Sequence, residues 1–285
     1  MGMTDVDAES GCAMKRKDRL LLIAVLLAGI WLLLGSTGLA ASKAVWPQTG
    51  KNTKTNGKLK LDISNTGDGY FMASVSKKNK HKLKLRVVKG SETLTYDLNG
   101  DTEYEVFPLQ LGSGKYEVTL YENVSGKKYA QEGKVTLTVK LKREDAAFLA
   151  PSQYLNYTKK SEAVAEANRQ CTGKNEKDAY KIVCNFMKSR FVYDFVKAAT
   201  VKAGVLPDID GSYAKKMGVC QDLSAIMVCM LRTQGIPARL MIGYADKQYH
   251  AWVVTTVGGK DEFFDPTAAL NGISKVRQYT LERYY

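Results

Sequence analysis

The most constraining feature of this sequence is a long helix pattern that begins at a cysteine, Cys220. Apolar residues then recur at helical spacing, at Leu223, Ile226, Met227, Met230 and Leu231. Gly235 and Pro237 are expected to end this helix. A cysteine at a helix start meets unpaired N–H groups and the positive end of the helix dipole, and both favour a thiolate.

Three short strands are predicted after this helix, over residues 239–244, 249–257 and 262–265. A two-residue turn at Gly258-Gly259 would pair Val257 with Lys260 and, further along, His250 with Thr267. Asp265 would then lie on the same face as His250, as its diagonal neighbour. A loop one residue longer would move Asp265 to the opposite face.

Cys220, His250 and Asp265 therefore form a candidate set in the order nucleophile, base and orienting carboxylate. Each residue also has a purely structural interpretation. A helical cysteine is usually a small buried apolar residue, which fits Cys229 well. Asp265 before Pro266 could simply start a turn. The three residues together, on elements that can converge, favour a reactive site.

The local strings around these residues resemble a known family. GVCQDLSA begins at Gly218, QGIPARLMIGY at Gln234, YHAW at Tyr249 and DPT at Asp265. Together they resemble the transglutaminase-like superfamily, a branch of the papain-like cysteine enzymes, and its bacterial membrane-anchored or exported type. The resemblance covers roughly residues 144–285. It implies that Cys220 is the nucleophile, His250 the base and Asp265 the residue that orients His250.

The resemblance also implies a reaction class, namely acyl transfer or hydrolysis on protein or peptide amides through a cysteine thioester. A cysteine peptidase and a cell-wall amide hydrolase are alternatives within the same chemistry. A catalytically silent binding or scaffold protein is the alternative outside it. The order of the three residues does not distinguish an amine acceptor from water.

An apolar segment stands near the start of the sequence. Residues 20–41 carry no charge and follow the basic cluster at residues 15–19. This length is sufficient to cross the roughly 30 Å apolar layer of a bilayer as a helix. We expect an uncleaved anchor, with a cleaved signal peptide as the alternative, because Gly38-Leu39-Ala40 offers a cleavage site. In both cases the later residues would lie outside the cytoplasmic membrane, and the protein would be membrane-bound or secreted.

The predicted organisation is α+β with four parts. Residues 1–42 form the tail and anchor, and residues 43–57 form a linker. Residues 58–142 change to a period of two, with eight candidate strands separated by glycine-containing turns. They predict an all-β, immunoglobulin-like sandwich. Residues 143–285 return to helical periodicity and form the papain-like, transglutaminase-like domain, with helices expected over 146–154, 161–170 and 175–188.

Composition limits the partners. The net charge of +13 suits an anionic surface, such as a cell-envelope polymer or lipid headgroups. No nucleic-acid partner is expected, because the lysines follow strand-like segments without a binding motif. No cofactor and no metal site are expected, since the two histidines are far apart and no C-x-x-C pattern occurs. The sequence leaves open the oligomeric state and whether Cys171 pairs with Cys184.

Overall fold

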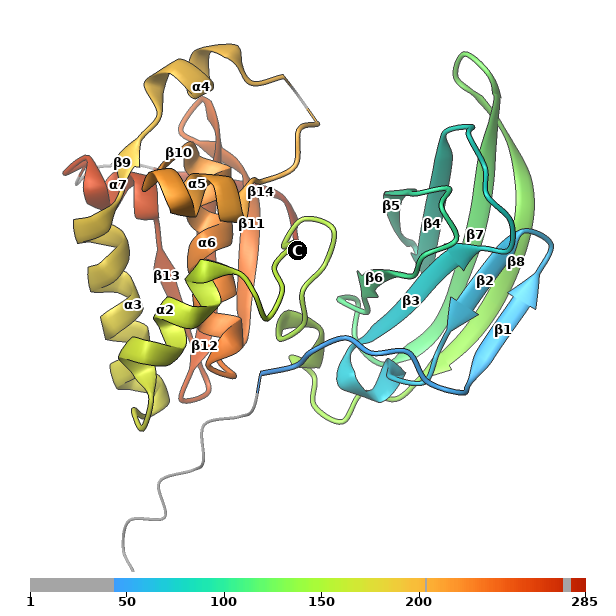
Figure 1. Cartoon of the computed structure of the whole chain (residues 1–285), viewed down its shortest axis with the longest axis horizontal. Coiled ribbons are helices and arrows are strands. Elements are labelled where there is room, and N and C mark those ends of the chain that lie inside the picture. The colour runs from blue at the N-terminus through green and yellow to red at the C-terminus, as the bar shows by residue number, and fades with distance from the viewer. Residues whose placement is uncertain (1–43, 203, 274–277) are drawn as a thin grey trace, which may run out of the picture. The chain divides into compact units, whose positions relative to one another are not determined.

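The computed structural model of the chain describes residues 44–202, 204–273 and 278–285 (Figure 1). The predicted anchor or signal segment at residues 20–41 lies outside these described residues. Within them, no helix combines the length and the apolar character that crossing a membrane would need.

Eight strands between residues 53 and 139 form two antiparallel four-stranded sheets (Figure 1). The first sheet has the order β1 (Thr53–Asn56), β2 (Leu59–Asp62), β3 (Tyr70–Val75) and β6 (Glu105–Pro108). The second has the order β5 (Glu92–Leu98), β4 (Leu83–Lys89), β7 (Gly114–Ser125) and β8 (Lys128–Val139). A short 3₁₀ turn, η1 (Thr66–Asp68), precedes β3.

Alternating apolar residues build the core between these sheets. In β4 the side chains of Leu83, Leu85 and Val87 are buried, whereas those between them are partly or fully exposed. Tyr96 of β5 meets Phe107 of β6 edge to face, with 5.2 Å between the ring centroids. Because these rings come from different sheets, the two inner faces share one apolar layer, as in a sandwich. The immunoglobulin-like class and the domain boundaries remain predictions.

Two predicted features of this region differ in the structure. The strand β1 lies within residues 43–57, which the sequence presents as a linker. Two of the eight candidate strands, which the sequence places at residues 127–131 and 134–141, form one strand, β8. An irregularity in its pairing with β7 near Gly133 lets the ladder continue. Gly133 suits this place, since an added Cβ would lie only 2.1 Å from the main-chain oxygen of Asn56.

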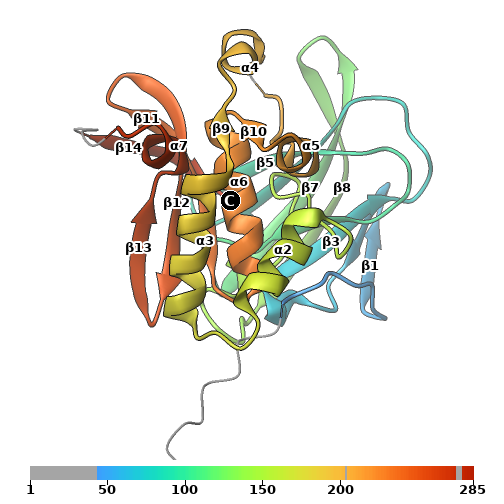
Figure 2. The ribbon, with the colours of Figure 1, turned by 60° about the vertical axis from the view of Figure 1, so that its left-hand side comes forward.

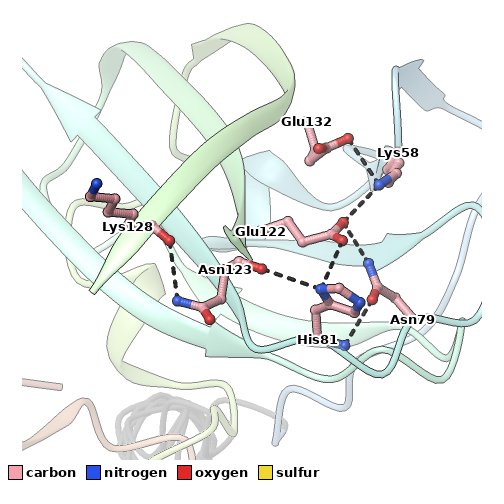
Figure 3. Close-up of polar contacts among 7 residues, drawn as sticks. All are labelled: Lys58, Asn79, His81, Glu122, Asn123, Lys128 and Glu132. Carbon is pink, nitrogen blue, oxygen red and sulfur yellow. Dashed lines mark hydrogen bonds and ion pairs between the residues drawn. The ribbon is translucent and has the colours of Figure 1, made fainter. Parts of the chain in front are cut away.

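A polar cluster occupies one surface of the sandwich (Figure 3). Glu122 accepts hydrogen bonds from Lys58 Nζ and Asn79 Nδ2, both at 2.7 Å. The ring of His81, which is exposed, lies 3.4 Å from the same carboxylate. Lys58 is the main reason that the pKa of Glu122 is held below its usual value. The contacts link β7 to the turn between β1 and β2 and to the loop between β3 and β4. Ion pairs with exposed partners contribute little to the free energy of unfolding.

The elements after residue 143 form separate sheets. The main sheet is antiparallel, in the order β13 (Lys260–Phe264), β12 (Gln248–Val257), β11 (Ala238–Ala245) and β14 (Tyr279–Tyr284). A short parallel pair joins β9 (Val192–Tyr193) to β10 (Met217–Gly218). The helices are η2 (Ala146–Phe148), α2 (Glu162–Cys171), α3 (Glu176–Arg190), α4 (Phe195–Thr200), α5 (Ile209–Lys215), α6 (Cys220–Thr233) and α7 (Pro266–Leu270).

Helix α6 lies at the centre of this region (Figure 2). It packs against β11 and β12 on one side and against α2 and α3 on the other. Every residue from Asp222 to Thr233 is buried. A helix that is covered all round must be apolar all round, which explains its run of aliphatic and sulfur-containing residues. The predicted start and end of this helix are confirmed.

Other helical predictions need correction. The helix expected over residues 146–154 is only the 3₁₀ turn η2. Beyond it, Pro151 restricts the preceding residue to extended conformations, and the chain continues without a helix to Ser161. The last strand, β14, is not among the strands expected from the sequence. It is short and mostly exposed, and its pairing with β11 defines it.

Arg232, near the end of α6, is a buried cation that forms hydrogen bonds with three other segments. The guanidinium of Arg232 is 1% exposed and donates to the main-chain oxygens of Ala238 at 2.8 Å, Ala150 at 2.5 Å and Tyr285 at 3.0 Å. Burial lowers the pKa of Arg232 to about 10, so the group is still charged at neutral pH. All three acceptors are main-chain oxygens, and they replace the water that the cation has lost.

We expect Arg232→Met to lower the free energy of unfolding by about 2 kcal/mol or more. Three buried main-chain oxygens would lose a donor, at about 1–3 kcal/mol each, while removal of a buried charge would return part of that loss. Urea denaturation followed by circular dichroism measures the change. A variant as stable as the parent would mean that the desolvation of the guanidinium cancels its three hydrogen bonds.

Candidate functional site

The structure places Cys220 at the first position of α6, directly after the parallel β9–β10 pair. Its side chain is partly exposed. Gly218 allows the tight turn before it, because an added Cβ would lie 2.9 Å from Cβ of Asp222 and 3.2 Å from Ser212. The first amide groups of a helix have no partner within the helix, so the thiol lies beside unpaired N–H groups, as the sequence predicts.

A buried carboxylate, Asp222, holds this turn in place. It is fully buried and accepts from the main-chain N–H of Val219 at 3.0 Å and of Asp208 at 2.9 Å. Its Oδ2 also accepts from Lys197 Nζ at 2.7 Å. This role of Asp222 is not among the sequence predictions. An acidic residue three positions after the N-cap is a known capping signal and could have identified it.

His250 and Asp265 lie side by side. His250 Nε2 is 2.8 Å from Asp265 Oδ2, and their side chains are 12% and 4% exposed. Because a carboxylate only accepts, Nε2 carries the proton in this contact. The other ring nitrogen, Nδ1, is therefore the one available to Cys220. The histidine comes from β12, and the aspartate is the N-cap of α7.

The hairpin register agrees with the prediction up to the end of β13. Val257 pairs with Lys260 across the Gly258-Gly259 turn, and Val253 pairs with Phe264. The further pairing of His250 with Thr267 is wrong, because the strand ends at Phe264 and α7 begins at Pro266. Asp265 still reaches His250, since it occupies the junction between the strand and the helix.

Asp265 accepts from two further groups. Its Oδ1 accepts from the main-chain N–H of Ala268 at 3.0 Å, which caps α7. Its Oδ2 accepts from the hydroxyl of Tyr279 at 2.8 Å, in addition to His250. Tyr279 packs edge to face against Trp252, with 5.0 Å between centroids. Sequence reasoning missed Tyr279, because only the pairing of β14 with β11 brings it to the site.

These contacts determine the protonation states of His250 and Asp265. Burial acts against protonation of His250, but hydrogen bonds with Asp265 and Cys220 outweigh it and raise the pKa of His250 to about 9. Burial alone would raise the pKa of Asp265, yet the bond from His250 and the other donors hold it below the usual value. The pair is therefore an imidazolium and a carboxylate at neutral pH.

Cys220 and His250 both line a cleft of about 580 Å³. One side of the cleft is formed by α4 and the residues after it, including Val201 and Val205. The other side is formed by strand residues that include Tyr244 and Tyr249. The volume falls within the range of small-molecule binding sites in proteins.

The other described cysteines are unlike Cys220. Cys171, Cys184 and Cys229 are all buried and free, so Cys171 and Cys184 are not paired in this structure. Burial raises the pKa of Cys184 to about 11. In the described ranges, no group of three or more histidine, cysteine, aspartate or glutamate residues has a metal-binding arrangement.

The substitution Asp265→Asn should lower the pKa of His250 well below 9, because the carboxylate that stabilises the imidazolium is replaced by a neutral amide while burial still opposes protonation. Titration of the two histidine Cε1–H signals by NMR measures this, with His81 as the reference signal in each sample. Tyr279→Phe is the matched control, since it removes one hydrogen bond but keeps the carboxylate, and its His250 signal should still titrate near 9. An Asp265→Asn titration that matches the parent would contradict the assignment of Asp265 as the partner of His250.

Part of the chain matches a known family. A family model described as the transglutaminase-like superfamily matches residues 165–262, a range that includes Cys220 and His250 and ends before Asp265. A search of curated proteins gives no significant match.

Among solved structures, a proposed cysteine protease from Cytophaga hutchinsonii is 16% identical, with a TM-score of 0.38, over 82% of this chain and 90% of that one. The periplasmic domain of TgpA from Pseudomonas aeruginosa is 14% identical, with a TM-score of 0.35, over 80% of each chain. Red sea bream transglutaminase is 12% identical, with a TM-score of 0.28, over 82% of this chain and 51% of that one. On the strength of the family match, residues 165–262 of this chain form a transglutaminase-like domain.

Proposed function

We propose that this protein is a cysteine enzyme that cleaves protein or peptide amides through a thioester on Cys220. One observation carries the proposal: a partly exposed cysteine at a helix start shares a cleft with a histidine whose far nitrogen is bound by a buried aspartate at 2.8 Å. This arrangement of nucleophile, base and orienting carboxylate is the general form of a nucleophilic acyl-transfer site.

In the acylation step, Cys220 attacks the carbonyl carbon of the amide as a thiolate, its proton being held on His250 Nδ1. The main-chain N–H of Cys220, at the start of α6, would donate to the developing oxyanion. His250 Nδ1 then gives its proton to the leaving nitrogen as the C–N bond breaks. The products are the free amine and the thioester. Asp265 keeps the proton of Nε2 in place throughout, so that Nδ1 is always the nitrogen that exchanges protons.

The second step determines whether the enzyme hydrolyses or cross-links. We propose water as the main acceptor. Several residues that line the cleft are exposed, including Gln248, Tyr249 and Lys202, so water would reach the thioester. His250 would take a proton from this water, the hydroxide would add to the carbonyl, and Cys220 would leave as the thiolate with a carboxylic acid as product. A transglutaminase outcome would need the exclusion of water and the entry of a primary amine.

The location of the reaction is a further part of the proposal. The uncharged segment at residues 20–41, which follows a basic cluster, supports a protein anchored in a membrane or secreted. Its substrates would then be proteins or peptides outside the cytoplasmic membrane, including components of the cell envelope. The net charge of +13 would favour anionic surroundings of this kind.

We expect Cys220→Ala to abolish turnover of peptide amides while changing the free energy of unfolding by less than about 2 kcal/mol. The matched control is Cys184→Ala, which removes a buried thiol in α3 and should retain turnover. Peptide anilides and glutamine-containing peptides, with and without a fluorescent primary amine, are the substrates, and mass spectrometry identifies the products.

The parent protein should give mainly the carboxylic acid, even with the amine present. Full activity of the Cys220→Ala variant would exclude Cys220 from the chemistry. An amine adduct as the main product would keep the thioester but overturn water as the acceptor.

A further inference from the structure

Several exposed apolar side chains line the cleft. Twelve large apolar residues are exposed in the described part of the chain, and four of these line the cleft. The four are Val201, Val205, Tyr244 and Tyr249. Single exposed apolar residues are ordinary, but a group of them marks an interaction site.

Both sides of the cleft carry exposed apolar side chains. Val201 and Val205, which are 36% and 47% exposed, lie on the side that follows α4. On the strand side, Tyr244 and Tyr249 are 43% and 48% exposed and meet edge to face, with 5.5 Å between ring centroids. Because these residues line the same cleft as Cys220, whatever covers them lies next to the reacting bond.

The charged residues of the cleft indicate which kind of substrate side chain it would accept. Lys202 and Arg283 contribute two positive charges and Glu282 one negative charge. Arg283 Nη2 donates to the hydroxyl of Tyr249 at 2.6 Å and lies 3.7 Å from Glu282. The excess of positive charge disfavours a cationic side chain beside Cys220. An uncharged apolar side chain would cover the exposed valines and tyrosines without that penalty.

Hydrogen bonds connect α4 and the segment that follows it to the turn that carries Cys220. Lys197 of α4 donates to Asp222, which also binds the main chain of Val219, next to Cys220, and of Asp208, beyond the valines. Gln221 Nε2 also donates to the main-chain oxygen of Val205 at 3.1 Å. These bonds connect Val201 and Val205 to the turn that carries the thiol, so the surface exists before any substrate binds.

We infer that this surface is a specificity subsite for a large apolar side chain of the substrate, placed beside the amide that reacts. Val201 and Val205 on one side and Tyr244 and Tyr249 on the other would enclose that side chain. The assignment rests on the proposed function for its substrate, because it takes the occupant to be the polypeptide whose amide Cys220 attacks.

The test measures the binding of peptides to a variant that cannot react with them. In the Cys220→Ala background, fluorescence anisotropy gives the Kd of labelled peptides that differ only at the residue preceding a central glutamine, which is leucine, phenylalanine, serine or lysine. We expect leucine and phenylalanine peptides to bind about tenfold or more tightly than the serine peptide, as burial of one large apolar side chain provides. The lysine peptide should bind most weakly.

Two valine variants locate the effect. Val205→Asp places a charge within the cleft and should remove most of the preference for leucine over serine. Val196→Asp makes the same change on α4 at a residue that is 77% exposed and does not line the cleft, and it should keep the preference. Equal binding of the leucine and serine peptides, or an equal loss of preference in both variants, would overturn the subsite.

This design separates the two proposals. A leucine preference that depends on Val205, combined with no turnover by the parent protein, would support the subsite and reject the proposed chemistry. Turnover by the parent protein without any preference in binding would support the chemistry and reject the subsite.

Discussion

The burial of helix α6 is the constraint on which the transglutaminase-like region depends. The helix has protein on all sides from Asp222 to Thr233, so its direction and depth cannot change without disturbing the sheet and both covering helices. Cys220 and Gln221, the first two residues of the helix, precede that burial and are only partly covered. The thiol is therefore fixed by the core of the protein, while its side chain still faces a cleft that substrate can enter.

A buried charged side chain lies near each end of α6, with opposite sign at the two ends. At its C-terminal end, Arg232 is a buried cation surrounded by carbonyl oxygens, which suits the negative end of the helix dipole. At its N-terminal end, Asp222 is a buried anion among N–H groups and Lys197. Asp222 satisfies the N–H of Val219, one of the groups that the start of a helix leaves unpaired. Arg232 binds main-chain oxygens outside the helix. Both charges join α6 to segments distant in sequence.

Asp222 and Asp265 repeat one arrangement at two places. Each carboxylate satisfies main-chain N–H groups at the start of a short or long helix, and each also holds a cationic side chain of the cleft region, Lys197 or His250. The structural and the functional interpretations of Asp265 are therefore both correct: it caps α7 and it orients the imidazole. Because one side chain serves both purposes, the position of the histidine is coupled to the fold of the segment that follows β13.

The sequence by itself determined the helix that starts at Cys220, the hairpin register through Val257 and Lys260, and the order of the three site residues, because periodicity and turn chemistry are local properties. It also indicated the family, since each site residue lies in a matching local string. Other features depended on tertiary structure. Tyr279 meets Asp265, and Lys197 meets Asp222, only because separate strands and helices converge. Strand β14 exists only through its pairing with β11, and contacts of this kind leave no pattern in the neighbouring residues from which they could be predicted.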